Sequence, residues 1–179
     1  GFVVTHPQSG TYVRDFTREG SGETLGQGLH VKKTIDRQTI ESLLRFRFVT
    51  ETAAARRAAL RIQESDIGYL ESSLERKKRH LKDAAVQAEC DYDFHRAIIT
   101  ISGDIISRLV FQSFKPVYAF FAELFYSIEG MPEASLELNL KLLKALKRKD
   151  QDASRKAMDN ILKFAEKKVY EAVKSEASR

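Results

Sequence analysis

With 179 residues, of which 42% are hydrophobic, the chain is long enough to bury one substantial core but short for two full domains. Its single cysteine excludes an internal disulfide, and no apolar run reaches the roughly 18 residues that span a bilayer, so we expect a cytoplasmic protein without membrane segments. The net charge of +5 is scattered, and its densest cluster, residues 75–80, is interpreted as a solvated helix face rather than a nucleic-acid patch.

The first 16 residues contain two runs rich in β-branched and aromatic residues, separated by the sequence Pro-Gln-Ser-Gly at residues 7–10. This pattern predicts a β-hairpin. A lone two-stranded ribbon is only marginally stable in water, so the hairpin is expected to be a fragment of a larger protein. A glycine-rich linker is predicted over residues 17–33.

From residue 34 to about residue 175, apolar residues recur with the 3.6-residue period of amphipathic helices, and few glycines or prolines interrupt them. Helices are predicted at residues 36–61, 66–84, a third segment ending at 102, 104–129, 132–149 and 150–174. Pro116 is expected to kink or break the fourth of these. The predicted fold is therefore an all-α antiparallel bundle of six or seven helices, forming one domain.

Several helix ends are marked by their own residues. Ser65 and Asp66 are expected to cap the start of the second helix, and Asp150 the start of the last one. Gly103 is expected to end the third helix in a left-handed conformation.

The third helix carries two polar groups on an otherwise apolar face, because Asp91 and His95 are one helical turn apart. Burying a carboxylate beside an imidazole is costly unless each group finds a partner. The turn therefore predicts a metal, a ligand or a hydrogen-bond network. A core histidine held by its own aspartate is an equally compatible interpretation.

The last two helices each carry an asparagine on the face expected to be buried. Asn139 lies among leucines that include Leu140, and Asn160 precedes Ile161. A tight turn at residues 149–150 would make these helices an antiparallel hairpin in which both asparagines lie at one level and face each other. Amides in a core predict an internal polar cavity, and a direct hydrogen bond between the two asparagines is the simpler alternative.

The first long helix contains Arg47 and Glu51, spaced one turn apart. Such a pair is most often an exposed ion pair that contributes a few tenths of a kcal/mol. A buried guanidinium that awaits an anionic ligand fits the spacing equally well.

A set of short motifs runs along the chain: Arg47-(x)3-Glu51 leading into Ala53–Ala59, Asp91-x-x-Phe94-His95, Ser102-Gly103-Asp104, and Ala145-Leu146 before Asp150. Together they resemble the C-terminal effector-binding domain, the FCD domain, of GntR-type bacterial transcription regulators of the FadR branch. The strands in residues 1–16 resemble the wing of the winged helix-turn-helix in such regulators. This resemblance implies that the DNA-reading helices precede Gly1.

The resemblance implies a helical domain that dimerises and binds small organic acids, in many members through a divalent metal held by an aspartate and three histidines. These positions correspond to Asp91, His95, Asn139 and Asn160. Zn²⁺ and Ni²⁺ prefer imidazole to a neutral amide, so a tightly bound metal is not expected. Instead, Arg47 is expected to pair with the effector carboxylate, the two asparagines to orient it, and Asp91 and His95 to add polar contacts.

The preferred interpretation is a ligand-controlled homodimeric regulator that binds operator DNA through the upstream domain, with no catalytic residues. The sequence contains no Glu-x-x-His, phosphate-binding loop or Cys-x-x-Cys motif. Two alternatives stay open: a free-standing helical-bundle enzyme or metal- or ligand-binding protein without DNA binding, and a structural dimerisation module without a ligand.

Overall fold

The computed structural model describes residues 3–6, 10–13 and 37–176 of the chain. Within this part there are two strands and seven helices. They are β1 (Val3–His6), β2 (Gly10–Val13), α3 (Arg37–Arg61), α4 (Glu64–Arg79), α5 (Ala84–Ile101), α6 (Ile105–Ser113), α7 (Lys115–Tyr126), α8 (Met131–Lys147) and α9 (Gln151–Glu176). The predicted all-α bundle is confirmed, and the predicted linker at residues 17–33 lies outside the described residues.

The two strands pair in antiparallel register, with Val3 opposite Val13 and His6 opposite Gly10. They lie where the sequence predicted a hairpin. The turn between them, residues 7–9, is outside the described part of the chain.

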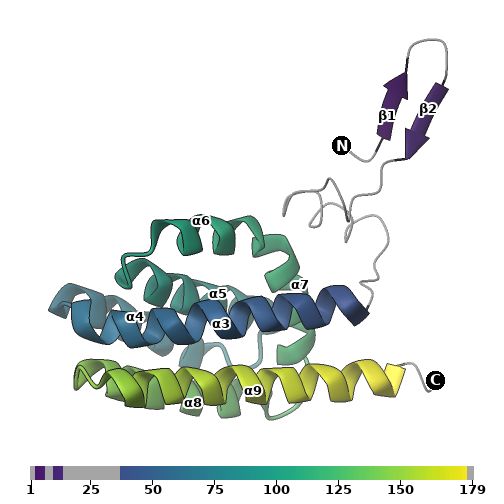
Figure 1. Ribbon diagram of the computed structural model, residues 1–179. Helices are drawn as coiled ribbons and strands as arrows, with labels where there is room; N and C mark the ends of the chain where they lie inside the picture. Colours follow the sequence, from purple (N-terminus) through teal and green to yellow (C-terminus); the bar gives the residue numbers. More distant parts are fainter. Residues whose placement is uncertain (1–2, 7–9, 14–36, 177–179) are drawn as a thin grey trace.

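Helices α3 and α9 are the longest and lie side by side in the bundle (Figure 1). They run antiparallel, because an ion pair of 3.7 Å joins Arg56 Nε to Asp152 Oδ1 near one end, while Ile40 and Val169 line the same cavity near the other. Helix α5 packs against α3, α4, α6 and α7, and α8 packs against α4 and α9. None of the described helices has the length and apolar character needed to cross a membrane.

The largest core cluster joins α3, α4, α5, α8 and α9, and its side chains include Phe94, Leu142 and Met158, all fully buried. Three alanines of the Ala53–Ala59 run, Ala55, Ala58 and Ala59, are fully buried in this cluster, and their small side chains allow neighbouring helices to approach closely. The single cysteine, Cys90, is buried on α5. Burial of a large apolar side chain contributes roughly 1.5–3 kcal/mol, so this cluster is the main source of the domain's stability.

Most predicted helix ends are confirmed. Gly103 has a φ of +76°, a left-handed conformation that favours glycine. Asp150 caps α9 by accepting a hydrogen bond of 3.0 Å from the backbone N–H of Ala153. The predicted fourth helix is divided at Phe114 into α6 and α7, just before Pro116.

The predicted bounds of the second helix are wrong at both ends. Gln63 is its N-cap, and Asp66 occupies the third position, where its carboxylate accepts a 3.0 Å hydrogen bond from the backbone N–H of Gln63. At the other end the helix stops at Arg79, because Asp83 already caps the start of α5 through a 3.0 Å bond from Val86.

Replacement of Phe94 by alanine should lower the free energy of unfolding by about 3–5 kcal/mol, because the ring is buried in the largest core cluster. The matched control is Leu60→Ala on α3, where the side chain is 59% exposed and the loss should stay below about 0.5 kcal/mol. Urea denaturation of both variants measures the difference. Equal small losses would contradict the placement of Phe94 in the core.

Candidate functional site

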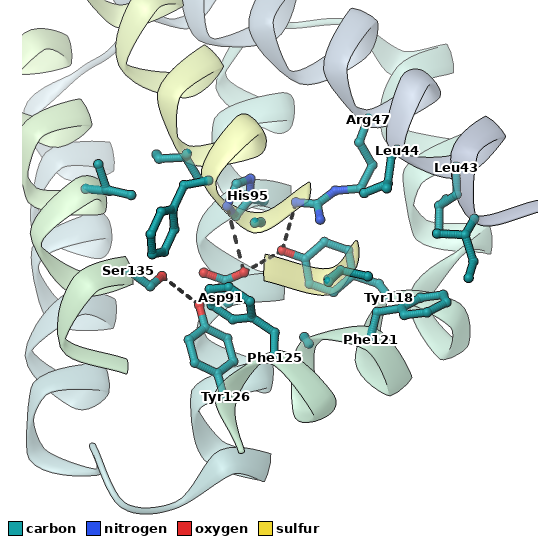
Figure 2. Close-up of a pocket in the computed structure, with 17 residues that line it drawn as sticks. Leu43, Leu44, Arg47, Asp91, His95, Tyr118, Phe121, Phe125, Tyr126 and Ser135 are labelled. Carbon is teal, nitrogen blue, oxygen red and sulfur yellow. Dashed lines mark hydrogen bonds and ion pairs between the residues drawn. The ribbon is translucent and has the colours of Figure 1, made fainter. Parts of the chain in front are cut away.

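A cavity of about 50 Å³ opens between α3, α5, α7, α8 and α9 (Figure 2). At roughly 10–15 Å³ per water molecule, it has room for a few waters or a small part of an organic ligand. One end is polar and the walls are apolar. The polar end is formed by Arg47, Asp91, His95, Tyr118, Tyr126 and Ser135, and the walls include Leu43, Leu44, Phe121, Leu138, Ile161 and Phe164.

Asp91 on α5 is the centre of the polar end. Its Oδ1 accepts hydrogen bonds from Lys77 Nζ at 2.7 Å and from Asn139 Nδ2 at 3.4 Å, and its Oδ2 accepts one from Tyr118 Oη at 2.7 Å. The donors come from α4, α8 and α7, so the carboxylate links three other helices to its own.

Lys77 on α4 is fully buried, and its ammonium group donates three hydrogen bonds. The acceptors are Asp91 Oδ1 at 2.7 Å, Tyr126 Oη at 2.8 Å and Ser135 Oγ at 3.0 Å. Tyr126 and Ser135 also bond to each other at 2.7 Å. Because an ammonium carries three N–H groups, all of them are used.

A second ion pair lies on the α3 side of the cavity. Arg47 Nε donates to Glu51 Oε1 at 2.6 Å, and its Nη2 donates to Tyr118 Oη at 3.3 Å. The guanidinium also lies over the Tyr118 ring, with Cζ 4.4 Å from the ring centroid. The structure combines the two interpretations left open by the spacing: Arg47 is paired with Glu51, but the pair is largely buried, since the Glu51 side chain is fully buried and that of Arg47 is 14% exposed.

His95 connects the two ion pairs. Its Nδ1 is hydrogen-bonded to Glu51 Oε2, and its Nε2 lies 3.9 Å from Asp91 Oδ2. Glu51, Arg47, Tyr118, Asp91 and His95 therefore form a closed ring of polar contacts. The Nε2 atom is buried without a hydrogen-bond partner among the described residues, which leaves it free for a ligand or a water.

Both acidic groups of this ring are held as carboxylates. Burial alone would raise the pKa of Asp91, but the charges of Lys77 and His95 and the hydrogen bonds it accepts hold that pKa well below its ordinary value. Burial would also raise the pKa of Glu51, and Arg47 and His95 together lower it instead. The polar end of the cavity thus contains two ion pairs and no protonated acid.

The two tyrosines stay protonated. Burial, with the nearby charge of Asp91, raises the pKa of Tyr118 well above its ordinary value even though Arg47 acts in the opposite direction. The pKa of Tyr126 is raised by burial and by the same carboxylate. Both hydroxyls therefore keep their hydrogens, and that of Tyr118 is donated to Asp91.

The two asparagines that were predicted to be buried differ in their exposure to solvent. Asn139 is fully buried against Asp91, as expected for a polar group on the core face of α8, although it does not line the cavity. The prediction that Asn160 faces it from the core is wrong, because Asn160 is exposed and Ile161 lines the cavity instead. The prediction that Leu140 is buried is also wrong, since it is 49% exposed.

Four residues at the polar end were not predicted from the sequence: Lys77, Tyr118, Tyr126 and Ser135. The burial of Glu51 was not predicted either. A signal for the lysine was present: Leu70, Leu74 and Lys77 recur with helical spacing, and all three are buried on α4. The interpretation of residues 75–80 as a solvated face is therefore wrong for Lys77.

The residues present do not fit a divalent metal. No group of three or more His, Cys, Asp or Glu side chains that could hold an ion occurs in the described part of the chain. Of the four positions that the family resemblance pointed to, only Asp91 and His95 supply typical ligands, and the ammonium of Lys77 is already bonded to Asp91.

The fold is an all-α bundle around a cavity with a polar end and apolar walls, and small-molecule sites in helical proteins commonly lie between the helices of such bundles. The family model described as the FCD domain matches residues 42–164. The chain therefore belongs to the FCD domain family, and the predicted kinship with ligand-responsive GntR-type transcription regulators is confirmed.

Solved structures of regulators share the fold. The GntR protein of Streptococcus agalactiae is 22% identical, with a TM-score of 0.62 over 90% of this chain and 72% of that one. E. coli McbR/YncC is 17% identical, with a TM-score of 0.66 over 96% of this chain and 78% of that one. Lar, described as controlling expression of the Listeria monocytogenes agr system and mediating virulence, is 15% identical, with a TM-score of 0.64 over 96% and 74% of the two chains. A comparison with curated protein sequences finds no match.

Replacement of Lys77 by methionine should lower the free energy of unfolding by about 3–5 kcal/mol, because it leaves the buried carboxylate of Asp91 without its cation. The double variant Lys77→Met, Asp91→Asn should lose less, since the uncompensated charge is gone. The control is Lys141→Met, which removes only an exposed ion pair and should change stability little. A double variant less stable than Lys77→Met alone would contradict the buried ion pair.

Proposed function

We propose that this domain binds a small organic acid in the cavity beside Asp91 and His95, and that binding controls operator DNA recognition by a winged helix-turn-helix of which residues 1–16 form the wing. In this proposal residues 17–33 are the linker, residues 34–175 are the effector-binding and dimerisation domain, and the protein acts as a cytoplasmic homodimer. The observation that carries the proposal is a cavity between the helices whose polar end is already built by paired charges.

Two groups at the polar end have unused capacity for a carboxylate. Arg47 is bonded through Nε and Nη2, and its Nη1 donates no hydrogen bond within the described part of the chain. His95 Nε2 is buried without a described partner. A carboxylate bonded to Arg47 and approached by His95 would gain charge-assisted hydrogen bonds without breaking the ring.

The walls of the cavity favour an acid with an apolar body. Leu43 and Leu44 approach from α3, Phe121 from α7, and Ile161 and Phe164 from α9. Figure 2 shows Leu43, Leu44 and Phe121 beyond Arg47 and Tyr118, away from the carboxylate of Asp91. A hydrocarbon chain or an aromatic ring on the acid would bury its surface there, at about 25 cal/mol for each Å² removed from water.

The position of the cavity suggests how binding is transmitted. Ile40, Leu43, Leu44 and Arg47 all lie in the first three turns of α3, the helix that follows the linker to the proposed wing. An effector that binds one arrangement of these turns more tightly than another shifts the population toward that arrangement. The position of the upstream DNA-binding domain would change with it.

Catalysis is not part of the proposal. The acidic groups are held in ion pairs, the tyrosines stay protonated, and the lysine is bonded through all three of its N–H groups. These features favour binding over proton transfer or nucleophilic attack.

Titration calorimetry with a panel of straight-chain and aromatic monocarboxylic acids tests the binding proposal, with the primary amide of each acid as a comparison. At least one acid should bind and its amide should not. Arg47→Gln should weaken that binding by about 10-fold or more, because a charge-assisted hydrogen bond is lost. Asn160→Ala, an exposed position on α9, is the control and should bind like the wild type.

Equal binding of acids and amides, or an unchanged affinity in Arg47→Gln, would contradict the assignment of a carboxylate to Arg47. For the DNA half of the proposal, the full-length regulator should select a specific sequence from random DNA. The acid that binds the cavity should change the affinity for that sequence in the wild type but not in Arg47→Gln. Light scattering on the same protein should give the mass of a dimer.

A further inference from the structure

We propose that the ammonium group of Lys77, which does not itself line the cavity but is bonded to Asp91 at its polar end, has the role a divalent metal would have, so that the site is assembled and binds its effector without a metal. The inference rests on the proposed function only in taking this cavity as the effector site. Its geometric basis and its metal-binding test do not depend on which effector is bound.

The surroundings of the ammonium are those of a bound cation. Its three hydrogen bonds, of 2.7, 2.8 and 3.0 Å, go to oxygens of Asp91, Tyr126 and Ser135, which belong to α5, α7 and α8. The lysine itself comes from α4 and is fully buried. One cation therefore holds four helices together, as a structural metal does in other proteins.

The groups around Asp91 are hydrogen-bond donors rather than metal ligands. Lys77 and Asn139 both donate to Oδ1, and the Tyr118 hydroxyl donates to Oδ2. A zinc ion would have to lie roughly 2.0–2.2 Å from one of these oxygens and would need lone pairs from its neighbours. Lys77, Tyr118 and Asn139 direct hydrogens rather than lone pairs at this carboxylate, and a second cation beside the ammonium would be repelled.

The backbone of Lys77 is also held in place by hydrogen bonds from α5. Gln87 on α5 is fully buried, and its Nε2 donates to the backbone carbonyls of Lys77 at 2.6 Å and His80 at 3.0 Å. Each carbonyl also accepts a backbone N–H bond, from His80 to Lys77 at 3.2 Å and from Asp83 to His80 at 3.0 Å, so Gln87 adds a second bond to each. The side chain that carries the cation therefore starts from a backbone that is anchored to α5.

The same contacts exclude a nucleophilic role for the lysine. An amine attacks a carbonyl through its lone pair, and a protonated amine with all three N–H groups engaged has none to offer. The geometry therefore assigns Lys77 to charge compensation and assembly. It is a positioning residue for Asp91, Tyr126 and Ser135.

Two side chains that could bind a metal, Asp91 and His95, nevertheless lie close together. The inference can therefore be tested by engineering a variant that gains zinc binding. Asp91 Oδ2 and His95 Nε2 are 3.9 Å apart, a gap that an ion could bridge at roughly 2 Å from each. Asn139 approaches the same carboxylate to 3.4 Å. The double variant Lys77→Ala, Asn139→His removes the ammonium group and adds a third ligand.

The experiment measures zinc retained after each protein is stripped with EDTA, incubated with excess Zn²⁺ and passed through gel filtration. The wild type should retain no stoichiometric zinc, and EDTA should not change its binding of the acid found in the calorimetric panel. Lys77→Ala, Asn139→His should retain one zinc per chain and unfold at a higher temperature with zinc than without. The control Lys141→Ala, Asn160→His changes two exposed positions and should behave like the wild type.

Wild-type protein that retains one zinc per chain, and loses it in His95→Ala, would overturn the inference. So would a folded Lys77→Ala, Asn139→His variant that gains no zinc. If that variant does not fold, as judged by circular dichroism, the metal content of the wild type decides alone. Absence of any acid binding would remove the proposed effector while the zinc result still stands, so the two failures are distinguishable.

Discussion

The carboxylate of Asp91 is buried in the middle of a helical bundle, and much of the surrounding structure follows from the cost of placing a charge there. An isolated buried carboxylate would be protonated or would prevent folding. Here a lysine, a tyrosine and an asparagine from three other helices compensate it. Because the compensation requires α4, α5, α7 and α8 to be in place together, this contact favours one arrangement of the helices over others that bury the same apolar surface.

A second buried carboxylate, that of Glu51 on α3, is also compensated by a cation. Arg47 and Lys77 match Glu51 and Asp91, so the four permanent charges of the polar end balance within the protein. In the proposed function the hydrogen-bonding geometry is thus in place before the effector binds, so that little reorganisation is needed. The apolar walls extend from this fixed end along α3, α7 and α9. In the proposed function the polar end would orient the carboxylate of the effector, and the apolar walls would contact its hydrocarbon part.

Features set by local spacing could be predicted from the sequence. Asp91 and His95 one turn apart, the break near Pro116, the turn at Gly103 and the cap at Asp150 each depend on a few neighbouring residues. The partners of Asp91 could not be predicted in the same way, because they lie 14 to 48 positions away in the sequence, on other helices. Within a helix the error was one of phase: a shift of one residue turns a side chain by about 100°, which separates exposed Asn160 from buried Ile161.

The single cysteine gives this interior a native chemical reporter. Cys90 precedes Asp91 on α5, its side chain is 1% exposed, and burial raises the pKa of its thiol above the ordinary value. Alkylating reagents react with exposed thiolate, so the folded domain should be protected and should react only when α5 separates from its neighbours. The rate of modification, followed by mass spectrometry without any engineered label, therefore reports how often the helix that carries the central carboxylate becomes open to solvent.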